Sequence, residues 1–576
     1  MPDSSAMTGA GSEPAELAAR LVQVLFEADP LRASLLGFHD RDAELPDLGD
    51  AAERALAGRL RELAAAAGRM DRDRLEPGDR LTLDVVMAVA RDGADVADTR
   101  RPEWQITDFW EGPAAGMLVF LPLVSLPEPA HAAAYLDRLR RLDGYLATAA
   151  QRHLAGLEAG RRPVARLVRA AVEQIDRYLA SPDLDPLRDP EPPADRSGAG
   201  RFRRDLDQVL ADVVRPAFRR YRDGLADAIE PSGRSDDHAG LCWLPDGEQL
   251  YRVLARTSTT TSQTPDDLHA AGLDLIAGLA EEYAQLGGRV FGRTDPAEVM
   301  RRLRDDPELR CSNAEQMLDE ARRAVARAET AAPRWFARQP REPCVVRPVP
   351  AAEAARAPLA YYVPAALDGS RPGTYWQNTR DPAGQPRHAI QFTAYHEAVP
   401  GHHIQNALAQ DMREAPLLRR VAEFDAFDEG WALYSERLAD EMGLYTDDLA
   451  RLGMLAGDSL RAGRLVVDTG IHALGWSRAK AVEFLRNNTP LAPADVEVEV
   501  DRYIAIPGQA LAYMVGRLEL QRMRASAEQR LGDRFDIRTF HDAVLGAGSL
   551  PLSVLDDRIG GWLREQGGSG LVPGLS

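Results

Sequence analysis

The stretch Tyr395–Gln405, YHEAVPGHHIQ, separates two parts of the chain with different sequence character. Upstream, between 343 and 394, the segments PCVVRPVP, APLAYYVPAA, GTYWQNT and HAIQFTAYH carry β-branched and aromatic residues bounded by Pro and Gly, which predicts a few short strands. Downstream, apolar residues recur at three- and four-residue spacing as far as LSVLDDRIGGWLREQ, which predicts helices. The stretch therefore lies where a small sheet meets a helical body.

The rest of the chain also favours helices. Segments such as PAELAARLVQVLFEADP and AHAAAYLDRLRRLDGYLATAAQRHLAGLEAG have helical periodicity, and SPDLDPLRDPEPPADRSGAGR (181–201) predicts a surface loop. In TSQTPDDLHAAGLDLIAGLAEEYAQL, Thr264 is the expected N-cap and Pro265 the first helical residue, followed by two aspartates. We predict one mainly α-helical domain over 1–576, a single large body with a mostly helical part at 1–342 and a part at 343–576 that holds the short strands.

Composition narrows the class of protein. The 576 residues are 45% hydrophobic and 28% charged, as in globular proteins, and the net charge of −19 argues against nucleic acid or an anionic membrane as the partner. Three widely separated cysteines, Cys242, Cys311 and Cys344, predict neither a disulfide framework nor a CxxC metal site and favour a reducing cytoplasm. We expect no signal peptide, and GMLVFLPLVSL is too short to span a bilayer.

The histidines of the opening stretch resemble the HExxH motif, in which two histidines one helical turn apart bind zinc. The position four after His396 is Pro400, so the strict motif is absent. Pro400-Gly401 predicts a break or bulge after Val399 that brings His402 to the second ligand position. His403 would share a face with His396 on a regular helix, but roughly 10 Å of axial rise separates them, and we prefer His402. In the alternative reading these histidines cap helices or lie on the surface.

A third ligand is expected on the segment FDAFDEGWALYSERLADEMGLY (424–445), whose apolar periodicity predicts a helix. Carboxylates aligned on an otherwise apolar helix are costly unless they are paired or coordinated. Zinc peptidases of the glutamate type take a ligand from a downstream helix, and Glu429 is the candidate. Glu436, Asp440 and Glu441 lie among other charges, so we expect them on a solvated face.

The motifs YHEAVPGHHIQ, DEGWALYSERLADEMGLY, RLVVDTGIHALGWSRAKA and RYIAIPGQALAYMVG, in this order, resemble the DUF885 family. YYVPAALDGSRPGTYWQNT and ASLLGFHDRDAELPDLGD extend the resemblance over nearly the whole chain. It implies an HExxH-like protein near the zincin peptidases, in which the histidine at the His402 position recurs more regularly than that at His403.

These ligands favour one Zn²⁺ ion, although another divalent ion is not excluded by the sequence. Zinc polarises a water molecule, and Glu397, adjacent to the first ligand, would remove its proton and pass it to the leaving amine. Glu397 is an ordinary helix carboxylate if His396 does not bind metal.

Further groups lie downstream of the histidines. Arg464, Asp468 and His472 form one polar stripe at four-residue spacing, and His472 could donate a hydrogen bond to the oxyanion or the substrate. A structural salt-bridge ladder would use the same spacing. Tyr503 and Tyr513 could stabilise a tetrahedral intermediate.

Substrate contacts are expected from both sides of the metal ligands. Arg502 suits a substrate carboxylate, and Gln509 follows the Pro507-Gly508 turn. Tyr361 lies on an expected edge strand that could hold an extended substrate. Each of these residues can also serve packing alone.

We therefore predict a zincin-like metallohydrolase that cleaves a peptide or another amide bond in a short peptide or a small molecule. An amide hydrolase of specialised metabolism is one alternative and a non-catalytic, metal-stabilised binding protein is another, and the latter would not need Glu397.

Overall fold

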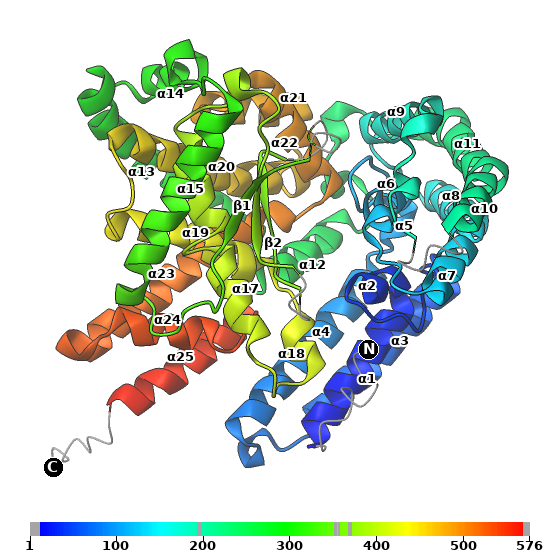
Figure 1. Cartoon of the computed structure of the whole chain (residues 1–576), viewed down its shortest axis with the longest axis horizontal. Coiled ribbons are helices and arrows are strands. Elements are labelled where there is room, and N and C mark those ends of the chain that lie inside the picture. Colours follow the sequence, from blue (N-terminus) through cyan, green and yellow to red (C-terminus); the bar gives the residue numbers. More distant parts are fainter. Residues whose placement is uncertain (1–11, 193–198, 351–353, 355–357, 367–370, 568–576) are drawn as a thin grey trace. The chain divides into compact units, whose positions relative to one another are not determined.

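The computed structural model describes residues 12–192, 199–350, 354, 358–366 and 371–567, and these form a mainly helical protein (Figure 1). The chain divides into two compact units. Unit 1 comprises Met1–Val253, Ile471–Lys480 and Val500–Pro507, and unit 2 comprises Leu254–Gly470, Ala481–Glu499 and Gly508–Ser576. The predicted single domain, with its division at 342/343, stays a prediction.

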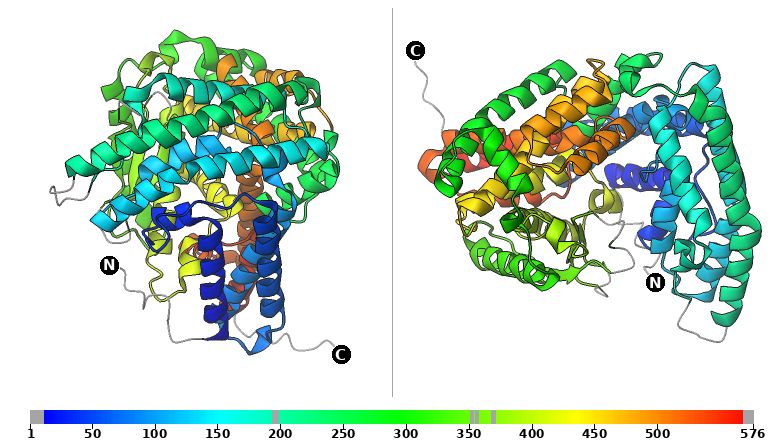
Figure 2. Two further views of the ribbon diagram at one scale, coloured as in Figure 1. Left: turned by 90° about the vertical axis from the view of Figure 1, so that its right-hand side faces the viewer. Right: turned by 90° about the horizontal axis from the view of Figure 1, so that it is seen from above.

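Unit 1 contains two groups of helices. α1, α3 and α4 pack side by side, and α7 to α11 bury apolar side chains such as Leu139, Val172 and Phe218 in a common core (Figure 2). Two π-helical turns, Leu210–Val214 and Leu225–Ile229, continue α10 and α11. The helices are α1 (Glu13–Ala28), α2 (Pro30–Leu35), α3 (Asp50–Gly68), α4 (Pro77–Asp98), α5 (Arg101–Trp104), α6 (Pro113–Phe120), α7 (Pro129–Arg140), α8 (Leu142–Glu158), α9 (Ala165–Ala180), α10 (Ala199–Val209) and α11 (Arg215–Gly224).

Unit 2 is built around α19, which carries the predicted glutamate ligand. It packs closely against α23, where a Cβ on Gly516 would lie 1.8 Å from the Ala426 carbonyl oxygen, so glycine is required there. The helices are α13 (Pro265–Phe291), α14 (Pro296–Asp305), α15 (Ala314–Ala331), α16 (Ala389–Glu397), α17 (His402–Gln410), α18 (Leu417–Val421), α19 (Asp425–Glu441), α23 (Ala512–Leu531), α24 (Ile537–Leu545) and α25 (Leu552–Gly567). Four helices have residues in both units: α12 (Gly247–Thr259), α20 (Asp448–His472), α21 (Arg478–Asn488) and α22 (Pro493–Ala505).

Three of the four predicted strands are confirmed and form one small sheet. β1 (Val345–Pro348), β3 (Thr374–Gln377) and β2 (Ala360–Val363) lie in that order, with β1 parallel and β2 antiparallel to β3. The sheet contacts α15 and α16 of the same unit. β2 is an edge strand, as predicted.

The fourth predicted strand, in HAIQFTAYH, is wrong because this segment forms α16. Most of its side chains are buried, on more than one side of the helix. A short apolar run that is buried all round shows neither helical nor strand periodicity, so its type is set by the tertiary structure.

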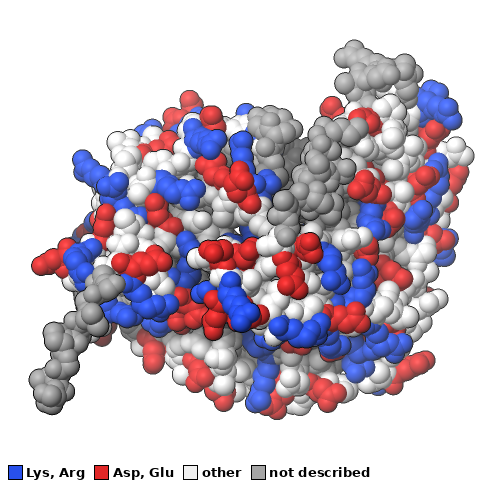
Figure 3. All heavy atoms as spheres, turned by 90° about the horizontal axis from the view of Figure 1, so that it is seen from below, with Lys and Arg blue, Asp and Glu red and all other residues white. Residues whose placement is uncertain are grey.

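Other local predictions can be compared with the structure. The N-cap of α13 is confirmed, since Thr264 and Asp267 form a reciprocal capping box and Pro265 follows. The predicted loop 181–201 contains two short 3₁₀ turns, and α10 already begins at Ala199, while 193–198 lie outside the described residues. Within the described ranges, no helix is long and apolar enough to cross a membrane. On the face shown in Figure 3, acidic and basic side chains are interspersed.

Candidate metal centre

Residues 398–401 interrupt the helical run at the predicted position. α16 ends at Glu397 and α17 begins at His402, while Ala398 and Gly401 have ψ angles of −109° and −128°, outside the helical region. A Cβ on Gly401 would lie 1.9 Å from the His396 carbonyl oxygen, so only glycine fits. The distortion thus takes the form of two separate helices rather than a bulge within one.

α19 fixes this break in place. Trp431 Nε1 and Ser435 Oγ both donate hydrogen bonds to the Pro400 carbonyl oxygen, over 3.1 and 3.2 Å, and both side chains are fully buried. The same helix carries Glu429, two residues before Trp431 and six before Ser435. The glutamate is therefore held in a defined position relative to the two helices that carry the histidines.

His396, His402 and Glu429 converge at this point. Each offers one ligand atom, and these atoms lie within 4.8 Å of one another. Glu429 Oε2 is 3.3 Å from His396 Nε2 and 3.7 Å from His402 Nε2, and the two imidazole planes are nearly perpendicular, at 89°. Two imidazoles and one carboxylate are the donor set of catalytic zinc sites, in which a fourth position stays open. The three predicted ligands thus have an arrangement that fits the ion.

Each histidine is oriented through its other ring nitrogen. His396 Nδ1 lies 2.9 Å from Glu436 Oε1, and His402 Nδ1 lies 3.1 Å from Gln405 Oε1. Gln405 in turn donates to Asp428, so the second support also ends on a carboxylate. Such partners on Nδ1 direct Nε2 toward a metal and increase its basicity.

Opposite charges dominate the electrostatics of the cluster. Burial alone would lower the pKa of His396, but hydrogen bonds with Glu429 and Glu436 raise it to about 9. Burial alone would raise the pKa of Glu429, but the two histidines hold it well below its usual range. The carboxylate is therefore ionised at neutral pH, as a metal ligand must be.

Glu397 has different surroundings from Glu429. Burial raises the pKa of Glu397, and His396 and His402 partly offset this effect. Among the residues that the structure describes, none donates a hydrogen bond to its carboxylate. A carboxylate with a raised pKa and no fixed donor is suited to accept a proton from a bound molecule.

The family model of DUF885, described as a bacterial protein of unknown function, matches residues 30–559. This chain belongs to the DUF885 family. The family description leaves the activity open, and no curated protein matches the chain.

Two solved structures resemble this DUF885 chain over almost its whole length. One is of a "putative lipoprotein" from Colwellia psychrerythraea, with 27% identity, a TM-score of 0.86, and coverage of 96% of this chain and 99% of that one. The other is of "a putative lipoprotein of unknown function" from Shewanella oneidensis, with 18% identity, a TM-score of 0.72, and coverage of 95% of this chain and 99% of that one. The second likeness shows a shared fold only.

His403 points away from the three ligands. Its Nδ1 is 3.0 Å from the Tyr362 hydroxyl and its Nε2 is 3.0 Å from the Glu342 carbonyl oxygen. The two nitrogens therefore connect α17 to β2 and to the residues just before β1. This geometry favours His402 over His403 as the ligand.

The role predicted for His472 must be corrected. His472 is fully buried in unit 1, where Nδ1 accepts a hydrogen bond from the Leu241 amide and Nε2 donates one to the Tyr503 carbonyl oxygen. Burial lowers the pKa of its imidazole to about 3. With both nitrogens bound to backbone groups, this histidine cannot donate to an oxyanion.

The other members of the predicted polar stripe have partners within unit 2. Arg464 pairs with Glu499 at 2.9 Å, and Asp468 accepts a hydrogen bond from the Gly508 amide over 3.1 Å. The structural alternative fits the stripe better than a catalytic role.

The remaining predicted site residues are distributed over both units. In unit 1, Tyr503 is fully buried, and Arg502 precedes it on α22. In unit 2, Tyr513 lies under the Arg464 guanidinium at 4.5 Å, Gln509 begins a short 3₁₀ turn, and Tyr361 stacks on Trp376 along β2 and β3. Their roles in catalysis and substrate binding stay predictions.

Two residues near the ligands were missed by sequence reasoning. Glu436 is 0% exposed and supports His396, so its predicted place on a solvated face is wrong. Its seven-residue spacing from Glu429 was the available signal, because that spacing puts both on one helix face. Arg461 of α20 lies with Nη2 3.7 Å from Glu436 Oε1 and is only 13% exposed, and its charge lowers the pKa of Glu397.

Proposed function

We propose that this DUF885 protein is a zinc-dependent hydrolase of a peptide or another amide bond. The observation that carries the proposal is the convergence of His396 Nε2, His402 Nε2 and Glu429 Oε2 within 4.8 Å, with Glu397 beside them. A structural zinc site fills all four positions with protein ligands, whereas three ligands and a nearby base are typical of a catalytic site. We also propose that this chain is related to the zincin peptidases.

Zinc held by these residues supplies a positive charge that polarises the scissile carbonyl and increases the acidity of water. Glu397 accepts the proton of the attacking water on its carboxylate and then delivers that proton to the leaving amine. Burial raises the pKa of Glu397, which makes its carboxylate a stronger base than that of an exposed glutamate and supports this role. Glu436 and Gln405 keep the two imidazoles in place throughout.

Arg461 replaces His472 as the candidate for stabilising negative charge on the substrate. Its guanidinium is close enough to Glu397 to lower the pKa of that carboxyl, and its Nε has no hydrogen-bond partner within the described part of the chain. A fixed positive charge beside the reacting carbonyl stabilises an oxyanion. Tyr503 and Tyr513 remain further candidates.

The proposed substrate is a short peptide or an amide-containing small molecule. β2 is an edge strand of the described sheet, and we propose that an extended substrate pairs with its outer edge, where Tyr361 lies. The net charge of −19 and the mixed surface charge in Figure 3 support a partner other than nucleic acid. Three unpaired cysteines support a cytoplasmic location. The two similar structures are described as putative lipoproteins, so cell fractionation is the test of this location.

Glu397→Gln tests the proposed reaction. We expect this variant to keep its zinc and to lose hydrolysis of a short-peptide library by at least about 100-fold, because only the proton acceptor is removed. Glu441→Gln, an exposed position on α19, is the matched control and should keep full activity. Unchanged activity in Glu397→Gln would remove this residue as the base. Zinc binding without any hydrolysis by the wild type would favour the non-catalytic alternative.

A further inference from the structure

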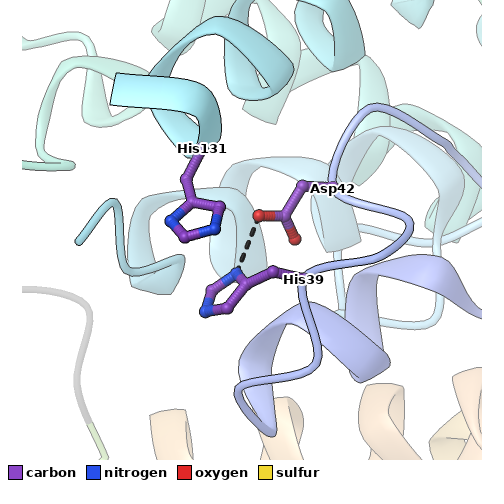
Figure 4. Close-up of side chains that lie close together, drawn as sticks. All are labelled: His39, Asp42 and His131. Carbon is purple, nitrogen blue, oxygen red and sulfur yellow. Dashed lines mark hydrogen bonds and ion pairs between the residues drawn. The ribbon is translucent and has the colours of Figure 1, made fainter. Parts of the chain in front are cut away.

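A second group of potential metal ligands lies in unit 1, outside the candidate metal centre. His39 and Asp42 are on the segment 36–49 between α2 and α3, and His131 is in the first turn of α7. Figure 4 shows the three side chains facing one another, with a ring nitrogen of His131 turned toward the Asp42 carboxylate. Two imidazoles and one carboxylate from segments about ninety positions apart thus meet at one point.

The distances suit a shared ion. One ligand atom from each residue lies within 4.8 Å of the other two, and His39 Nδ1 is 2.8 Å from Asp42 Oδ2. Zinc bonds of about 2.0–2.1 Å in tetrahedral geometry place ligand atoms about 3.4 Å apart, so closure needs movements of about 1 Å. The two imidazole rings stack, with their centroids 4.1 Å apart and an angle of 25° between their planes. Rotation of the His131 side chain would direct His39 Nδ1 and His131 Nε2 at one ion.

Hydrogen bonds hold the Asp42 carboxylate in a fixed orientation. Its side chain is 3% exposed, and its second oxygen, Oδ1, accepts a hydrogen bond from Ser34 Oγ over 2.5 Å. Ser34 Oγ in turn accepts one from the buried Arg138 over 2.8 Å. This leaves Oδ2 directed toward the histidines. Outer hydrogen bonds of this kind fix a ligating carboxylate before metal arrives.

The two histidines leave the cluster open to solvent on one side. Both are partly exposed, and the His131 Nδ1 accepts a hydrogen bond over 3.3 Å from the Glu128 amide in the capping box of α7. Nε2 is therefore the nitrogen of His131 that is available to an ion. A buried carboxylate with two accessible imidazoles is a donor set that selects transition metals over Mg²⁺ or Ca²⁺.

We propose that His39, Asp42 and His131 bind a second divalent transition-metal ion, with zinc as the expected occupant. The ion ties the segment 36–49 to α7, and it stabilises unit 1 because it binds the folded state and not the unfolded one. This site is independent of the proposed hydrolase activity, because none of its residues belongs to the candidate metal centre.

The test is zinc stoichiometry in the full-length protein, stripped with chelator and dialysed against Zn²⁺. The double variant His39→Phe/His131→Gln removes both imidazoles but keeps a stacking ring and a side chain that can serve the capping box. We expect two zinc ions per wild-type chain and one in the double variant. Zinc should also raise the melting temperature of the wild type by on the order of 5 °C more than it raises that of the variant. His238→Gln, an exposed histidine of unit 1, is the control and should keep both ions.

Equal zinc content in the double variant and the wild type, with equal melting temperatures, would overturn the proposal. Equal melting temperatures of the two proteins in chelator would show that the variant is folded, so that a lost ion reports a lost site. His396→Gln separates the two sites. If His396→Gln kept all of its zinc while the double variant lost one ion, the proposed function would fail and this inference would stand.

Discussion

Glu436 contacts His396 through Nδ1, the ring nitrogen that does not face Glu429. Its Oε1 lies 2.9 Å from His396 Nδ1, it is fully buried, and its Oε2 has no hydrogen-bond partner within the described part of the chain. Burying a carboxylate without full pairing is costly, and Arg461 Nη2 at 3.7 Å offsets only part of its charge. A positive ion on the far side of the imidazole would compensate this charge, which gives Glu436 a defined part in the site.

Glu436→Gln should lower zinc affinity by about 10- to 100-fold, because the amide keeps the shape of the side chain but not its charge. Competition with a chromophoric chelator measures this change. Glu441→Gln on the same helix is the control, since Glu441 is exposed and pairs with Arg524. Equal zinc affinity in both variants would mean that Glu436 only fills space.

The sequence could single out the three residues of the candidate centre, and their ligation of a metal stays a prediction. Pro400-Gly401 directed attention to His402, and the carboxylates on the apolar helix 424–445, together with the likeness to glutamate-type zinc peptidases, directed it to Glu429. The spacing of Glu436 from Glu429 places both on one helix face, but it does not show the contact of Glu436 with Arg461, which comes from a different helix. His472 was misjudged for the same reason, because its partners lie far away in the sequence.

Among the helices and strands, the break between α16 and α17 determines the shape of the site. Trp431 and Ser435 bind the Pro400 carbonyl oxygen, and Gly401 lies against the end of α16 with no room for a Cβ. The sequence predicted this break from proline and glycine chemistry alone. It did not predict that the segment before the break is a helix, because α16 is buried on most sides and lacks an amphipathic pattern.

Gly401→Ala should displace α17 and with it His402. We expect a loss of at least about 2 kcal/mol in the free energy of unfolding together with loss of zinc binding, since the new methyl group would overlap the His396 carbonyl oxygen. Urea unfolding and zinc titration measure the two effects. Gly278→Ala on α13 is the control, because nothing lies within 4 Å of its added Cβ. Similar behaviour of the two variants would contradict the described geometry.

Buried neutral histidines make the stability of the whole chain depend on pH. His153 in unit 1 donates from Nδ1 to the Pro102 carbonyl oxygen over 2.7 Å and accepts at Nε2 from the Tyr221 hydroxyl over 2.8 Å. Burial lowers its pKa from 6.5 to about 4, so this imidazole is protonated at a lower pH in the folded state than in the unfolded state. His541 in unit 2 has an equivalent environment, with a pKa lowered to about 3.

The contribution of His153 is complete above pH 6.5 and is lost as the pH falls toward 4, because the unfolded state then takes up more protons. It amounts to about 3 kcal/mol, at up to about 1.4 kcal/mol per pH unit. His153→Gln should therefore reduce the slope of the free energy of unfolding against pH over this window, as measured by urea unfolding at several pH values. His238→Gln should keep the wild-type slope, and an unchanged slope in His153→Gln would contradict the assignment.

Zinc stoichiometry of the matched variants His402→Gln and His403→Gln tests the central claim most directly. The two positions are adjacent, but only His402 Nε2 faces Glu429, while His403 binds Tyr362 and the Glu342 carbonyl oxygen. Elemental analysis of the zinc-loaded, full-length proteins should show one ion fewer in His402→Gln than in the wild type and no loss in His403→Gln. Zinc retained in His402→Gln, or lost only in His403→Gln, would contradict the proposed centre.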